Sequence, residues 1–204
     1  MDRSKLNEQI ADFWEWFGLN IEILKAVITT DHHPKTEGII QGLDQHILGM
    51  GKLKWELGNP FDGQFTFTIS PNNDRELLAI TKAIIAQSPN DPNWKFLHAI
   101  EASNNYEIQV YDIDMDIQNV DAKPWRVILI PGADNRFEMV LEIANIEHLD
   151  EDTQLIAADL ILTSLLGEEN KVNYLAGLEL TNEFEEEDAE NCFPIQQLLF
   201  QLIG

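Results

Sequence analysis

The sequence predicts an α+β protein in which N-terminal helices precede two ββαβ units and a C-terminal helix. Three observations lead to this prediction. Apolar residues recur at helical spacing through residues 1–50, and they alternate with polar residues in 52–101 and again in 125–180. The two alternating stretches share one order of predicted elements, which is two strands, a helix and a third strand. Two such units side by side predict a ferredoxin-like sheet with helices on one face.

Residues 1–50 show the helical pattern. Leu6, Ile10, Phe13 and Phe17 form one stripe, which Gly18 is expected to end. A second apolar cluster lies at 21–28, the polar segment TTDHHPKTE follows as a loop, and a third helix is expected at 36–48. The motif FWEWF is more typical of a helix core than of a binding site. Its Trp16 lies off the stripe and could instead reach the sheet or a partner.

The first ββαβ unit covers residues 52–101. Asn73 and Glu76 have the spacing of a capping box, which predicts a helix over about 74–87. Alternating apolar residues predict the strands of this unit, which are KLKWELG (52–58), QFTFTIS (64–70) and WKFLHAIE (94–101).

The second unit repeats this order over 125–180. Asp150 is expected to cap a helix that runs through Leu166 and stops at Gly167. NYLAGLE (173–179) matches KFLHAIE (95–101) position by position, by duplication or by convergence. The strands expected here are WRVILI (125–130), RFEMVLEI (136–143) and NYLAGLE.

At 204 residues the chain is expected to form one integrated domain with three segments. These are a helical segment (1–50), the first unit with a connecting acidic strand (52–121), and the second unit with its tail (125–204). In the tail, EFEEEDAE (183–190) predicts a solvated acidic loop, and FPIQQLLFQLI (193–203) predicts a helix that packs back onto the body.

Charge is the strongest compositional signal. The net charge is −23, and residues 101–204 hold 23 acidic and 4 basic residues. Such a surface disfavours nucleic acids and anionic membranes, and it favours basic partners, cations or simple solubility. The absence of a signal peptide or a long apolar run, together with the single cysteine Cys192, predicts a cytoplasmic protein without a disulfide.

Three aspartates in VYDIDMDIQNVD (110–121) raise the possibility of a calcium loop. Asp112, Asp114 and Asp116 have the required first spacing, but both possible registers lack the turn glycine and the final glutamate. Strict alternation instead predicts a strand with the three aspartates in water. Its opposite face, directed toward the core, would hold Tyr111, Ile113, Met115 and Ile117.

Other chemistry has weak support. His32, His33 and Glu37 lack the spacing of a zinc site, Cys192 lies among acids that disfavour its thiolate, and no phosphate-binding or nucleophile motif is present. We therefore predict no metal, no cofactor and no catalytic residue. His98 is the first place to look for an unusual histidine, beside neighbouring carboxylates.

The segments FWEWF, KWELG and FTFTISPNNDRELL, together with NWKFLHAI, resemble a family of uncharacterised soluble bacterial proteins. The resemblance covers about the first half of the chain. It implies a bacterial cytoplasmic protein with one intact fold, and it implies no activity or site residues.

The function that the sequence favours is a non-enzymatic acidic binding or regulatory protein, of inhibitor, immunity or adaptor type, which contacts a basic protein. An alternative is a small-ligand or metal-dependent enzyme that uses His98 and nearby carboxylates. A third is a structural oligomer joined through unpaired edge strands. The residues predicted to contact the partner are Asp112, Asp114, Asp116, Glu185, Glu186, Glu187 and Asp188.

Overall fold

The computed structural model describes residues 3–61 and 63–203. It is a mixed α+β structure, and the chain divides into two compact units, Met1–Ile100 and Glu101–Gly204. Each unit has its own hydrophobic core.

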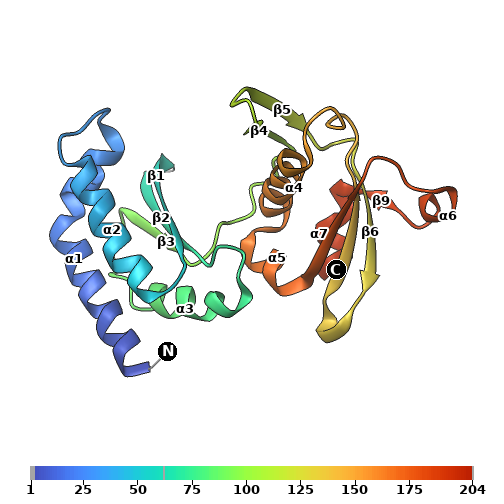
Figure 1. The fold of residues 1–204 in the computed structure, drawn as a ribbon. Helices are drawn as coiled ribbons and strands as arrows, with labels where there is room; N and C mark the ends of the chain where they lie inside the picture. Colours follow the sequence, from blue (N-terminus) through green and yellow to red (C-terminus); the bar gives the residue numbers. More distant parts are fainter. Residues whose placement is uncertain (1–2, 62, 204) are drawn as a thin grey trace. The chain divides into compact units, whose positions relative to one another are not determined.

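The first unit packs two helices against a three-stranded sheet (Figure 1). β1 pairs antiparallel with β2, and β3 pairs parallel with β2 after the helix α3. Its elements are α1 (Arg3–Thr29), α2 (Thr36–Met50), β1 (Lys54–Phe61), β2 (Gln64–Ser70), α3 (Arg75–Ile85) and β3 (Trp94–Leu97).

Gly18 does not end the first helix, contrary to the sequence-based expectation. α1 runs on to Thr29, and Leu24 is fully buried in the same core as Phe13 and Phe17. A glycine inside a helix costs about 1 kcal/mol relative to alanine. Burial of a leucine side chain contributes about 1.5–3 kcal/mol, so tertiary packing outweighs the local preference.

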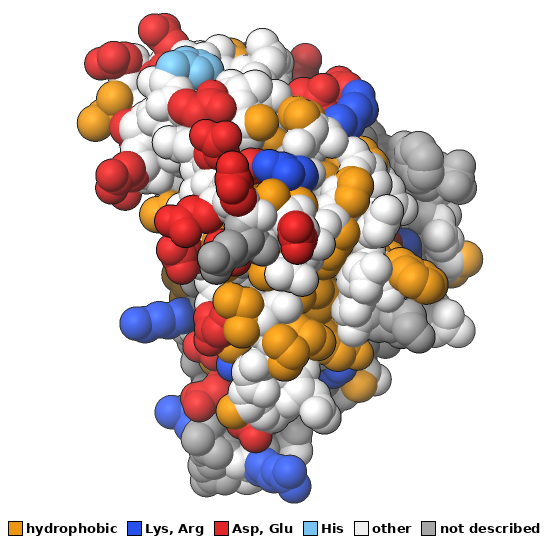
Figure 2. Space-filling view, turned by 90° about the vertical axis from the view of Figure 1, so that its right-hand side faces the viewer, with side chains coloured by type: hydrophobic (Ala, Val, Ile, Leu, Met, Phe, Trp, Pro, Cys, Tyr) orange, Lys and Arg blue, Asp and Glu red, His pale blue; other side chains and the backbone are white. Residues whose placement is uncertain are grey.

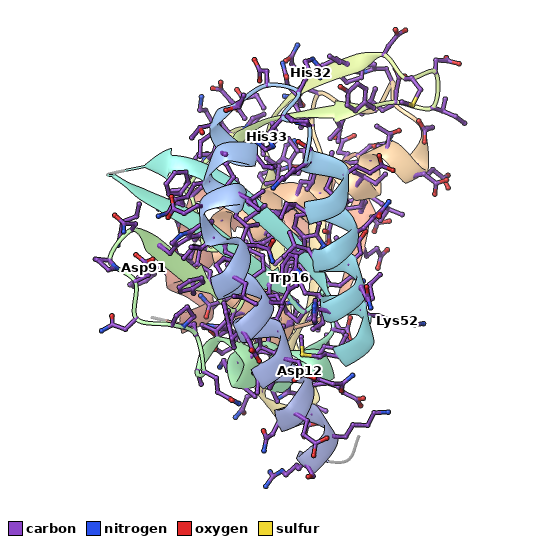
Figure 3. The ribbon with its side chains drawn as sticks, turned by 90° about the vertical axis from the view of Figure 1, so that its left-hand side faces the viewer. Asp12, Trp16, His32, His33, Lys52 and Asp91 are labelled. Atoms are coloured by element: carbon purple, nitrogen blue, oxygen red, sulfur yellow. The ribbon has the colours of Figure 1, made fainter. Side chains whose placement is uncertain are left out.

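Trp16 packs against α2 rather than reaching the sheet. A side chain at Gly42 would collide with the Trp16 ring, which also lies 5.3 Å from the His46 ring between centroids. Figure 3 shows Trp16 between the two helices. The glycine therefore allows the close approach of α1 and α2 at this point.

The second unit contains a two-stranded hairpin and a four-stranded sheet. Figure 1 shows α4 and α7 on the same side of the larger sheet. The elements are β4 (Glu107–Tyr111), β5 (Ile117–Asp121), β6 (Arg126–Pro131), η1 (Ala133–Asn135), β7 (Phe137–Glu142), α4 (Glu151–Leu166), α5 (Glu168–Tyr174), β8 (Leu175–Thr181), α6 (Glu186–Ala189), β9 (Phe193–Pro194), η2 (Ile195–Gln197) and α7 (Leu198–Ile203).

The strands do not form the single ferredoxin-like sheet that the sequence predicted. The described strands lie in three sheets, of which the largest has the order β8-β7-β6-β9. β6 and β7 are antiparallel, and β8 runs parallel to β7. The short β9, which the tail was not expected to contain, pairs with Arg126 and Val127 at the start of β6.

The caps of α4 are as predicted. The Asp150 side chain accepts a hydrogen bond from the Thr153 N–H at 2.9 Å, and Gly167 follows the helix with φ of +72°. The aspartate pairs with a backbone N–H of the first turn, and the Gly167 N–H donates to the Thr163 carbonyl of the last turn. Both bonds satisfy backbone groups that a helix end leaves unpaired. The helix presents Ala157, Ile161 and Leu165 to the core of the second unit, beside Trp125.

The predicted strand through residues 110–117 is wrong. β4 ends at Tyr111, a turn covers 112–116, and β5 begins at Ile117. This hairpin belongs to the second unit, because Val110 and Val120 are buried in its core.

Candidate partner-binding site

A tight turn joins β4 and β5 and carries the three aspartates. The Asp112 N–H donates to the Asp116 carbonyl at 3.0 Å, and the Met115 N–H donates to the Asp112 carbonyl at 2.9 Å. Met115 adopts φ of +64°. A three-residue loop that ends in a left-handed residue is a common hairpin connection.

The Asp112 side chain holds this turn together. Its Oδ1 accepts from the N–H of Asp114 at 3.0 Å and of Asp116 at 2.9 Å, and its Oδ2 accepts from the Gln118 amide at 2.7 Å. The Gln118 hydrogen bond, followed by that from Asp116, lowers the pKa of Asp112. Asp112 therefore positions the turn and has little capacity left for a partner.

The apolar side chains of the turn, and those of the strand residues on either side of it, face water, contrary to the expectation that they would enter the core. We call Tyr111, Ile113, Met115 and Ile117 the hairpin tip; they are 60%, 80%, 72% and 54% exposed. Because the chain reverses between them, the alternation that predicted one buried face does not apply. Figure 1 shows the hairpin extending past one end of α4.

The base of the hairpin is anchored to the second unit. Val110 and Val120 are 4% and 2% exposed in its core, and the Ala122 N–H donates to the Tyr106 carbonyl at 2.8 Å. A shallow hollow of about 500 Å³ lies along the hairpin, lined by residues 107–109 and 119–121. The tip is thus an exposed apolar cluster on a fixed base.

The acidic segment 183–190 is built differently. Phe184 is buried, and its N–H donates to Glu142 at 3.2 Å. Arg126 forms two hydrogen bonds with the Glu142 carboxylate and lies over the Phe184 ring, 5.5 Å from its centroid. The Arg126 hydrogen bond lowers the pKa of Glu142. The segment is therefore fastened to the larger sheet at its first residues.

Beyond this anchor the acids point to solvent. Glu185, Glu186 and Asp188 are exposed around the short helix α6, and the side chain of Glu187 lies outside the described residues. Cys192 follows, with its Sγ 3.6 Å from an Arg126 nitrogen. Phe184 is buried, so the exposed side chains of segment 183–190 offer charge without large apolar groups.

Every basic residue of the second unit donates to a group within that unit, and the 23 acidic residues outnumber the 4 basic ones, so the unit has a negative net charge. The pairs are Lys123 with Glu107, Arg126 with Glu142, Arg136 with the Leu175 carbonyl, and Lys171 with Asp159 and Thr163.

His98 does not lie on a strand. It occupies a bend after β3 ends at Leu97, and it is not among the residues that line the hollow on the hairpin or those near α2. The enzyme alternative that uses His98 stays a prediction.

The loop between α1 and α2 contains His32 and His33. Figure 3 shows both at the end of α1, where they line an open hollow of about 760 Å³ with Asp31 and Glu37. Within residues 3–61 and 63–203, no three His, Cys, Asp or Glu side chains are grouped so as to hold a metal ion. In the same part of the chain, no helix is long and apolar enough to cross a membrane.

Comparison with known proteins gives no match: no family model, no curated protein and no solved structure is similar to this chain. The resemblance carried by FWEWF, KWELG and FTFTISPNNDRELL thus stays a prediction and supplies no site residues.

Proposed function

We propose that this chain is an acidic binding protein, of the adaptor or inhibitor type, and that it contacts a basic protein through the hairpin tip. The observation that carries the proposal is the exposure of four large apolar side chains at one hairpin turn and on the strand ends beside it, with three aspartates in the same turn. A single exposed apolar residue is ordinary on a protein surface. A contiguous group of them is typical of an interaction site.

The composition of the tip fits an interface. Aromatic residues and methionine are enriched where proteins meet, and Tyr111 and Met115 supply both. The hydrogen bonds of Asp112 hold the backbone of the turn before a partner arrives. Such preorganisation lowers the entropic cost of binding.

The charges around the tip indicate the class of partner. Asp114 and Asp116 are exposed beside the apolar side chains, and Lys123, the first basic residue after the hairpin, is paired with Glu107 at the start of β4. A complementary surface has an apolar pocket with Lys or Arg on its rim, since opposite charges guide association and like charges oppose it. The same argument disfavours nucleic acids and anionic membranes as partners.

The experiment is quantitative capture from a lysate with wild-type chain and the double variant Ile113→Ser/Met115→Ser. Phe200→Ser is the matched control, since Phe200 is 73% exposed in the same unit but lies in α7. We expect proteins that are retained by wild type and by the control to be lost from the double variant.

A second arm tests the charges. Asp114→Asn/Asp116→Asn should reduce capture of the same proteins and make it less dependent on salt concentration, because screening acts on exposed charges. If the double tip variant captures the same proteins in the same amounts as wild type, the tip is not the binding site and the proposal fails.

A further inference from the structure

The outer edge of the larger sheet in the second unit is a separate surface. β8 is an edge strand of that sheet, and among the described residues it pairs with β7 alone. Unpaired strand edges in native proteins are commonly shortened, bulged or covered, because they can bind another strand. β8 is seven residues long and carries one charged residue, Glu179; its pairing with β7 is irregular between Leu175 and Gly177 and regular from Gly177 to Thr181.

The pairing with β7 determines which backbone groups point outward. The Ile143 N–H donates to the Thr181 carbonyl, and Glu142 lies opposite Thr181 in the parallel register. Successive residues of a strand direct their hydrogen-bonding groups to opposite sides, so Thr181 and Glu179 bond to β7. The N–H and C=O groups of Leu178 and Leu180 therefore point away from β7, toward the outer edge of the sheet.

The two faces of this edge have different chemistry. Leu178 and Leu180 lie beside Met139 and Leu141 on the core face and are only partly buried. Another apolar side chain placed beside each leucine would cover the part that is still in contact with water.

The opposite face is acidic at the edge. Glu179 is exposed beside Val140, and the Glu138 carboxylate lies over Gly177, where any side chain would collide with it. Two carboxylates thus stand next to the free backbone groups. Figure 2 shows one face of the second unit, with a band of hydrophobic side chains and Asp and Glu side chains beside it.

We propose that β8 binds an extended peptide segment in which basic and apolar residues alternate, added to the sheet as a further strand. Its backbone would bond to Leu178 and Leu180. Its apolar side chains would lie beside those leucines, and its Lys or Arg side chains would lie beside Glu179 and Glu138. Main-chain pairing supplies affinity in this mode, and alternate side chains supply specificity.

The same charges oppose a second copy of this chain as the occupant. Antiparallel pairing of two β8 strands centred on Leu178 would place Glu179 of each copy beside Gly177 and Glu138 of the other. The Glu138 carboxylate lies over Gly177, so two like charges would meet on one face of the paired strands and destabilise the pairing. A basic segment replaces this repulsion with attraction.

The probe is a synthetic peptide of about eight residues in which Val and Lys alternate, the length of an ordinary strand. The control is a peptide of the same composition in which all the valines precede all the lysines, so that the alternation is lost. Amide hydrogen exchange is followed residue by residue. On binding, exchange at Leu178 and Leu180 should slow by roughly tenfold or more, while Glu179 and Thr181, already bonded to β7, should change little.

Charge variants separate strand addition from non-specific attraction. Glu138→Lys/Glu179→Lys should weaken binding of the alternating peptide by about tenfold or more. Glu186→Lys/Glu190→Lys makes the same change in net charge within the acidic segment and should leave binding close to that of wild type.

Three results would overturn the proposal. They are no binding of the alternating peptide, equal binding of both peptides, and binding without protection of Leu178 and Leu180. The variant Ile113→Ser/Met115→Ser should bind the peptide as wild type does, so failure of the hairpin tip as a binding site is distinguishable from failure of the β8 edge.

Discussion

The two acidic segments of the second unit, 112–116 and 183–190, look alike in composition but are built in different ways. In the first, one aspartate organises a turn that exposes large apolar side chains. In the second, an apolar side chain, Phe184, is buried and the acids beyond it are exposed. Dense negative charge alone therefore does not define a binding surface. The apolar residues between the charges decide its character.

The largest effect on stability is expected at the anchor of 183–190. Phe184→Ala should destabilise the second unit by about 3 kcal/mol, because it empties a buried aromatic site and removes the ring beneath Arg126. Urea titration followed by NMR at the resolved indole N–H of Trp125 reports on this unit, since Trp125 is buried in its core and the other four tryptophans belong to the first unit. A loss below about 0.5 kcal/mol would show that Phe184 is not an anchor.

Glu142→Gln should lower the free energy of unfolding by about 1–2 kcal/mol at neutral pH, since it removes a charged partner from the half-exposed Arg126. Hydrogen bonding lowers the pKa of Glu142 in the folded state, so its contribution is present above the ordinary glutamate pKa. The contribution is lost as the pH falls through the folded pKa. Wild type and variant should therefore converge in acid, and a difference that is constant with pH would contradict this assignment.

Asp112→Asn should loosen the turn at 112–116 with a smaller effect on the whole unit. Its carboxylate accepts from Asp114, Asp116 and Gln118, and loss of these bonds should speed amide exchange at Asp114 and Asp116. The pKa of Asp112 is lowered, so in wild type the same loosening should occur only as the pH falls through its folded value. Exchange that is unchanged in the variant would mean that the backbone alone holds the turn.

The smallest effect on stability is expected at the hairpin tip itself. Ile113→Ser and Met115→Ser should each change the free energy of unfolding by less than about 0.5 kcal/mol, because both side chains are already in water. Denaturation curves that overlay those of wild type would confirm this exposure. A marked loss of stability would instead show that the tip packs within the protein, and the comparison with 183–190 would fail.

Local sequence determined several features of this protein. The helical stripe from Leu6 to Phe17, the Asp150 cap and the Gly167 stop needed no tertiary information, because neighbouring residues specify helix periodicity and caps; the continuation of α1 past Gly18 did need it. The negative charge of residues 101–204 follows from composition alone.

Only the tertiary structure decided where those charges and apolar groups lie. The alternation in 110–117 fits a strand, but Asp112 can accept hydrogen bonds from the backbone two and four residues on, and this favours a turn. Aspartates at every second position were the available signal for that turn. Whether Met115 is buried or exposed depends on this choice, because a reversal of the chain separates residues that a strand would place on one face.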